Sequence, residues 1–257
     1  MDLTLPSIID GGLSNALEAQ GCNLDHPLWT ARLLDEHPEA IVRAHLAYLQ
    51  AGAKCIITSS YQASIPGLLD LGYDLAFAKK LLLRTVILAQ NAVNEYMKEN
   101  EVPGRLLIAA SIGPYGAYLA DGSEYRGNYG MSRQALYDFH HDRIQLLDTS
   151  AADLFACETI PSELEAQVLC EILLHTSKPA WISFSCRDEK HLNDGTPIDQ
   201  AVRSLADHPN VLAIGINCTA PKYVSGLIRT IKPVIGDKKL IVYPNSGETY
   251  FPESKSW

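Results

Sequence analysis

The feature that most constrains the fold is an apolar run ending in polar or glycine-rich residues, which recurs seven times along the chain. Segments with helical periodicity separate the runs. The runs are apolar throughout rather than alternating, as in parallel strands buried on both faces. The pattern therefore predicts an α/β protein with a parallel sheet. The expected strands are Ser7–Ile9, Ala53–Ser60, Leu106–Ser111, Asp153–Ala156, Trp181–Ser185, Val211–Ile216 and Leu240–Tyr243.

The alternation of strands and helices in 257 residues suits a (βα)8 TIM barrel, which needs roughly 250 residues. Doubly wound sheets share this order, but polar residues follow every expected strand, where barrel active sites are built. We expect one barrel domain over residues 1–257. Only seven strand–helix units are readable, and ten residues follow Gly247. Because a crossover to a parallel strand takes a dozen or more residues, we expect the eighth unit to be missing.

Composition limits the classes of partner. The chain is 47% apolar and 20% charged, as ordinary globular proteins are, and its net charge is −9. That charge argues against nucleic acid and anionic membranes as main partners. Gly113, Pro114 and Gly116 interrupt the longest uncharged run, so we expect no membrane span. Six irregularly spaced cysteines, with no readable signal peptide, predict reduced thiols and a cytoplasmic location.

Local signals place several helix ends. A long helix is expected to start at Asp74. Ser162–Glu165 follows Pro161 and has the capping-box pattern, in which the serine and the glutamate each bond a backbone amide of the other. The spacing of Leu164, Val168 and Ile172 predicts the buried face of the helix that follows.

Cys218 is the most informative candidate for chemistry. It follows an apolar strand and Asn217, and a thiol at the mouth of a buried parallel strand can ligate a soft metal or act as a nucleophile. A buried apolar thiol is the alternative, and a single cysteine slightly favours it. A nucleophile is the weaker interpretation, because none of the eight histidines ends a strand to serve as its base.

Two carboxylates also end strands. Asp10 and Glu158 are candidates for binding an ammonium group, and capping or solvation of a loop is the alternative. Gly11 and Gly12 either expose backbone amides to a carboxylate or form a tight turn. Together these residues describe a site for an amino-acid zwitterion. Cys157 precedes Glu158 on the strand, so we expect its side chain to point the opposite way, toward the helices.

The long loop after Leu106–Ser111 is rich in tyrosine. Tyr115, Tyr118 and Tyr125 could face a cation, as aromatic rings attract positive charge. They could equally pack the loop itself. The residue pattern does not decide between the two.

Motifs along nearly the whole chain carry a family resemblance. The chain resembles the zinc-dependent homocysteine S-methyltransferases, in the branch that uses S-methylmethionine or S-adenosylmethionine. The most specific run is Ser111–Gly127, with the sequence SIGPYGAYLADGSEYRG. The other matching segments are Asp10–Gly12, Leu17–Cys22, Leu28–Trp29, Ala51–Ala53, Ser60–Ser64, Cys157–Thr159, Gly215–Cys218 and Tyr243–Gly247.

The resemblance implies a (βα)8 barrel that holds one zinc ion on three cysteines, one of which is Cys218. The other two form an adjacent pair near the C-terminus of the family, and this sequence contains no such pair. By resemblance, a homocysteine site is implied at Asp10, Gly11, Gly12, Tyr61, Glu158 and Asn217. Asn245 is a weaker carry-over.

The implied reaction transfers a methyl group from a sulfonium to a zinc-bound homocysteine thiolate and yields methionine. A sulfonium leaves readily, so no strong general acid is required, which suits the lack of a histidine at a strand end. The alternative is a truncated, catalytically inactive form that lacks two of the three zinc ligands.

Overall fold

The computed structural model describes residues 4–24 and 29–247. The chain divides into two compact units. Unit 1 comprises Met1–Ser111 and Gln145–Leu154, and unit 2 comprises Ile112–Ile144 and Phe155–Trp257. Each unit contains parallel strands connected by helices, so the predicted α/β class is confirmed.

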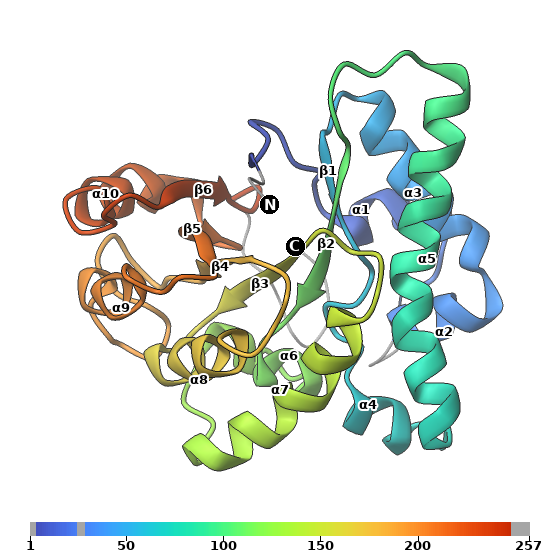
Figure 1. Ribbon diagram of the computed structural model, residues 1–257. Helices are drawn as coiled ribbons and strands as arrows, with labels where there is room; N and C mark the ends of the chain where they lie inside the picture. Colours follow the sequence, from blue (N-terminus) through green and yellow to red (C-terminus); the bar gives the residue numbers. More distant parts are fainter. Residues whose placement is uncertain (1–3, 25–28, 248–257) are drawn as a thin grey trace. The chain divides into compact units, whose positions relative to one another are not determined.

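Unit 1 combines a short parallel strand pair with a group of helices (Figure 1). In this pair Cys55 lies opposite Leu107. The long helix α5 runs alongside α3, and both bury an apolar face. The elements are α1 (Leu13–Glu18), α2 (Trp29–Glu36), α3 (Pro38–Gln50), β1 (Cys55–Ile57), α4 (Ile65–Asp70), α5 (Leu75–Glu99) and β2 (Leu107–Ile112).

In unit 2, four parallel strands pair in chain order, with α8, α9 and α10 next to one another on one side of them (Figure 1). Every residue of the first two of these strands is buried. The elements are α6 (Tyr115–Leu119), the 3-10 helix η1 (Ser123–Tyr125), α7 (Arg133–Asp148), β3 (Leu154–Ile160), α8 (Glu163–Leu173), β4 (Ala180–Phe184), α9 (Ile198–Leu205), β5 (Val211–Asn217), α10 (Pro221–Ile231) and β6 (Lys239–Tyr243).

The first expected strand forms only in part. Ile9 makes a single parallel bridge to Cys55, and the Asp10 amide donates to the Cys55 carbonyl at 3.0 Å. Ile8 is 58% exposed, so this short segment does not bury both of its isoleucines. The described residues therefore contain six strands where seven were expected, and the first expected strand is reduced to this single bridge. None of the described helices is long and apolar enough to cross a membrane.

The helix caps follow the sequence, with one informative difference. The long helix α5 starts directly after Asp74, close to the predicted position, and Asp74 caps it by accepting from the Phe77 amide at 2.8 Å. Ser162 accepts from the Glu165 amide at 3.3 Å, which is half of the expected capping box. The Glu165 carboxylate instead points inward, where it accepts from the Tyr115 amide at 2.6 Å.

The inward orientation of the Glu165 side chain shows that the predicted buried face of α8 was partly wrong. Leu164, expected inside, is 37% exposed, whereas Glu165 is fully buried together with Val168 and Ile172. Glu165 rather than Leu164 faces the interior because two hydrogen-bond donors there satisfy its carboxylate. The second donor is His140, whose Nε2 lies 2.9 Å from Glu165 Oε1.

His45, on the buried face of α3, makes unit 1 sensitive to acid. Neither ring nitrogen has a hydrogen-bond partner within the described residues, and burial lowers the pKa of His45 to about 4 from 6.5. The unfolded chain therefore takes up this proton first as the pH falls. We expect the free energy of unfolding to decrease from pH 6.5 to pH 4 by up to about 3 kcal/mol through this residue.

Urea unfolding of wild type and His45→Leu between pH 7 and pH 4 measures this effect. The variant should lose less stability than wild type over that interval. His175→Leu, which changes an exposed histidine, is the control and should follow wild type. Parallel curves for wild type and His45→Leu would contradict the assignment.

Candidate functional site

Asn217, at the end of β5, ties that strand to the end of β3. Its Oδ1 accepts from the Thr159 amide at 2.7 Å, and its Nδ2 donates to Thr159 Oγ1 at 2.8 Å. The hydroxyl oxygen Thr159 Oγ1 and the amide nitrogen Asn217 Nδ2 each lie 3.4 Å from the sulfur of Cys218. Thr159, Asn217 and Cys218 therefore form one hydrogen-bonded cluster, which we call the thiol cluster.

The backbone is strained at two members of the thiol cluster. Thr159 has φ = 61° and Cys218 has φ = 44°, both in the left-handed region that non-glycine residues rarely adopt. The register of β3 against β4 shifts between Cys157 and Ile160, so Thr159 sits in an irregularity of the strand. Such strain persists where surrounding contacts fix it, and it concentrates at functional sites.

Side chains of strands β6 and β4 fix the position of the Glu158 carboxylate. Tyr243 of β6 donates its hydroxyl to Glu158 Oε2 at 3.1 Å. The same hydroxyl accepts from Trp181 Nε1 at 3.0 Å and lies 2.7 Å from Ser183 Oγ, both on β4. Burial, together with the charge of Glu158, raises the pKa of Tyr243 well above its usual value. Tyr243 therefore stays a neutral donor that orients the carboxylate.

The surroundings of Cys218 keep its thiol protonated. Burial raises its pKa to about 11, the Thr159 hydrogen bond acts against this, and the carboxylates of Glu158 and Glu124 raise it further. A bound metal cation would reverse this balance and favour the thiolate. However, the described residues contain no group of three or more His, Cys, Asp or Glu side chains that could hold a metal ion. Those residues thus do not complete a metal site around Cys218.

In unit 1, Asp10 and the two glycines form a second polar group. Asp10 is 8% exposed, and its Oδ2 accepts from the Ile57 amide at 2.8 Å. Tyr48 donates its hydroxyl to the Gly12 carbonyl at 2.8 Å, and a Cβ on Gly11 would lie 3.1 Å from the Tyr48 ring. Gly11 therefore allows this ring to approach the backbone. Burial and the charge of Asp10 raise the pKa of Tyr48.

The structure thus brings together three of the predicted site residues, Glu158, Asn217 and Cys218, in unit 2. Asp10, Gly11 and Gly12 lie together in unit 1, and Tyr61 is half-buried in the segment between β1 and α4. Cys157 is buried, and burial, followed by the nearby Cys170 of α8, raises its pKa. Sequence reasoning assigned no role to four residues that take part in these contacts: Tyr48, Glu124, Thr159 and Tyr243.

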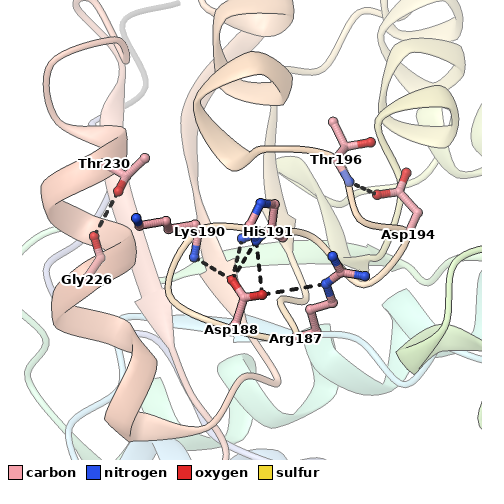
Figure 2. Close-up of polar contacts among 8 residues, drawn as sticks. All are labelled: Arg187, Asp188, Lys190, His191, Asp194, Thr196, Gly226 and Thr230. Atoms are coloured by element: carbon pink, nitrogen blue, oxygen red, sulfur yellow. Dashed lines mark hydrogen bonds and ion pairs between the residues drawn. The ribbon is translucent and has the colours of Figure 1, made fainter.

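The loop between β4 and α9 contains a tight turn (Figure 2). Asp188 accepts from the amides of Lys190 and His191 at 2.8 and 2.9 Å, which closes a tight turn. At the start of this loop, the Cys186 amide donates to Thr219 Oγ1 at 3.0 Å. Thr219 in turn donates to the Asn217 carbonyl at 2.9 Å, so the loop supports the thiol cluster from outside.

The tyrosines of the loop after β2 pack against one another. The Tyr115 ring lies 5.5 Å from Tyr118, 5.5 Å from Tyr129 and 5.0 Å from Phe139 of α7, measured between centroids. Such tilted and edge-on pairs stabilise the loop. For Tyr115 and Tyr118, packing of the loop is therefore the better supported of the two interpretations.

Comparisons with known proteins agree on one family. The sequence profile described as Homocysteine S-methyltransferase matches residues 7–257. The homocysteine S-methyltransferase of Escherichia coli (strain K12) is 47% identical over 97% of this chain and 81% of its own length. YbgG of Bacillus subtilis (strain 168), also named a homocysteine S-methyltransferase, is 45% identical over 97% of this chain and 80% of its own.

Solved structures give the same result. The metallated form of the homocysteine methyltransferase MmuM from Escherichia coli superposes with a TM-score of 0.89 at 47% identity, covering 93% of this chain and 83% of that one. Its apo form superposes with a TM-score of 0.78, covering 94% and 83%.

The contacts of Asn217 predict its contribution to stability. Asn217→Ala removes both hydrogen bonds to Thr159 and leaves a buried amide without its acceptor, which should cost about 2–3 kcal/mol of the free energy of unfolding. Urea unfolding measures this loss. Asn94→Ala, on the exposed side of α5, is the control and should change stability by no more than about 0.5 kcal/mol. An equal effect of the two substitutions would show that the pairing with Thr159 contributes nothing.

Proposed function

The chain belongs to the homocysteine S-methyltransferase family of methyltransferases, and from this membership we propose that its methyl donor is a sulfonium, S-methylmethionine or S-adenosylmethionine. The acceptor is the thiol of homocysteine, and the product is methionine. The observation that supports this best is the thiol cluster beside a fixed carboxylate at the ends of parallel strands. In parallel α/β proteins, ligands bind at the carboxyl ends of the strands.

The reaction needs little from the protein beyond binding and orientation. Homocysteine loses its thiol proton to solvent, and a lone pair of its sulfur forms the new bond to the methyl carbon. The bond between that carbon and the donor sulfur breaks, and its electrons stay on the donor sulfur, which becomes a neutral thioether. Holding the two sulfur atoms in line with the methyl carbon supplies much of the acceleration.

We assign binding of homocysteine to the residues that sequence analysis selected: Asp10, Gly11, Gly12, Tyr61, Glu158 and Asn217. Glu158 is suited to an ammonium group, because Tyr243 fixes one of its oxygens and its surroundings are buried. Asp10 is likewise buried and fixed by a backbone amide. Asn217 acts by holding the thiol cluster together.

We propose that Cys218 is one ligand of a zinc ion. The chemistry of the donor supports this, since thiolate suits zinc, and the Escherichia coli relative has a metallated form. A zinc ion would supply the charge that converts a bound thiol into a thiolate at neutral pH. The described residues offer Cys218 alone rather than a full set of ligands.

Two broader proposals follow. We propose that residues 1–257 act as one homocysteine-binding domain of (βα)8 type, which the parallel pairing of successive strands supports. We also propose a cytoplasmic location, which the six free cysteines support, because thiols stay reduced there.

Steady-state kinetics test the role of the carboxylates. Glu158→Gln should raise KM for homocysteine about ten-fold or more, because a charge-assisted hydrogen bond becomes a neutral one. Asp10→Asn should act in the same direction. Glu39→Gln, on α3, is the control and should leave KM unchanged. An unaltered KM in both site variants would remove these carboxylates from homocysteine binding.

Metal content and activity together test Cys218. In enzyme purified with zinc, Cys218→Ser should lower the zinc content and reduce methyl transfer at least about 100-fold. Cys22→Ser, a half-buried cysteine of unit 1, should change neither quantity. Elemental analysis gives the zinc content independently of activity. Retention of both zinc and activity by Cys218→Ser would refute its role as a ligand.

A further inference from the structure

Glu124, in η1, is a carboxylate of unit 2 that, unlike Glu158, has no proposed part in binding homocysteine. Its Oε2 atom is buried and has no hydrogen-bond partner in the part of the chain that the structure describes. The arginine two residues further along does not pair with it, because Arg126 Nη2 lies 3.0 Å from Asp121 and 2.8 Å from Ser123 Oγ. A buried carboxylate oxygen without a donor is costly, and burial raises the pKa of Glu124 to about 7. A bound cation would offset that cost.

Hydrogen bonds tie the backbone of Glu124 to the thiol cluster. Ser185 Oγ lies 3.1 Å from the Glu124 carbonyl oxygen and 3.3 Å from that of Thr159. Asn193 Nδ2 donates to the same Glu124 carbonyl at 3.4 Å.

Close packing keeps Glu124 in this position. A Cβ on Gly116 would lie 2.4 Å from the Glu124 amide nitrogen, so the backbone of α6 rests directly on η1. Gly127, at the other end of the segment, has φ = 77° and would bring a Cβ within 2.8 Å of the Pro161 carbonyl oxygen. The segment is therefore packed on both sides, and its carboxylate is preorganised rather than mobile.

Resting on the proposed methyl transfer, we propose that the Glu124 carboxylate binds the positively charged sulfonium of the methyl donor beside Cys218. A sulfonium has no proton to donate, so it suits a carboxylate oxygen that the fold leaves without a hydrogen bond. The ammonium of homocysteine already has a proposed partner in unit 2, the carboxylate of Glu158. Glu124 therefore serves the donor rather than the acceptor.

The charge change in the reaction determines the kinetic signature. The donor enters as a cation and leaves as a neutral thioether, so attraction to Glu124 is strongest before transfer and is lost after it. Such an interaction stabilises the bound donor at least as much as the transition state. Loss of the charge should raise KM for the donor while leaving kcat near the wild-type value or above it. It should also leave affinity for the neutral product unchanged.

A matched pair of ligands tests this directly. S-Methylmethionine and methionine share the amino-acid part and differ only in the added methyl group and the positive charge on sulfur. By calorimetric titration of the enzyme, Glu124→Gln should weaken binding of S-methylmethionine about ten-fold or more and leave methionine binding within about two-fold. Glu171→Gln, which neutralises an exposed glutamate on α8, is the control and should change neither affinity.

Each other outcome contradicts the proposal. Equal weakening for both ligands would mean that Glu124 binds their common ammonium group. A raised KM for homocysteine alone would place Glu124 at the acceptor, and unchanged affinities would give it no binding role. Glu124→Asp keeps the charge and should retain most of the preference for S-methylmethionine, and Glu124→Ala replaces the glutamine variant if that one does not fold.

The titration also separates this inference from the proposed function. Failure of wild type to methylate homocysteine from either donor would refute the proposed function. The preference of wild type for S-methylmethionine over methionine, and its loss in Glu124→Gln, are measured without turnover. A wild type that binds both ligands equally would refute the assignment of Glu124 alone.

Discussion

The double hydrogen bond between Asn217 and Thr159 is the interaction on which the rest of the site depends. It holds two residues in left-handed conformations that their side chains disfavour, Thr159 and Cys218, and it directs both polar groups at one sulfur atom. A single amide side chain therefore offsets the backbone strain and orients the thiol. The same strained turn in β3 immediately follows Glu158, so the geometry of the thiol and of the carboxylate are set together.

A second buried network supports the loop that carries Glu124. Glu165 accepts from the Tyr115 amide and contacts His140, and Arg143 bonds both His140 and the Gly113 carbonyl. All three charged or titratable side chains are almost completely buried. Burial, followed by the charge of Arg143, lowers the pKa of His140 to about 4, so its ring is neutral at physiological pH. Unit 2 thus uses charged groups internally to fix the start of α6, next to which η1 packs.

The sequence was most informative where one residue type decides the local structure. The apolar runs identified the strands, and Asp74 and Ser162 marked helix starts, because burial and capping depend on neighbours in the chain. The direction of Glu165 could not be predicted, because its donors come from Tyr115 and His140, far away in sequence. A strand was expected at Ser7–Ile9, but only the single bridge at Ile9 forms. Periodicity does not reveal whether a two-residue apolar run has a partner surface against which to be buried.

The same limit applies to the site. The strand-end position selected Glu158 and Cys218, the family resemblance added Asn217, and the structure brings these three together. Thr159 and Tyr243 stood inside the recognised motifs, but their roles depend on partners 58 and 85 residues away. A rule that weighs every polar residue at a strand end, rather than acids and cysteines alone, would have found both. Glu124 lies in the three-residue helix η1, which is too short for any periodicity to point to it.

Burial and two carboxylates act together on the Cys218 thiol. Burial raises the pKa of this thiol, Glu158 and Glu124 raise it further, and burial also raises the pKa of Glu124. A bound cation would favour the charged forms of the thiol and of Glu124. With the proposed sulfonium donor, methyl transfer would consume the donor's positive charge. The neutral thioether product would no longer offset the charge of Glu124, so the reaction itself would weaken the proposed contact and favour release of the demethylated product.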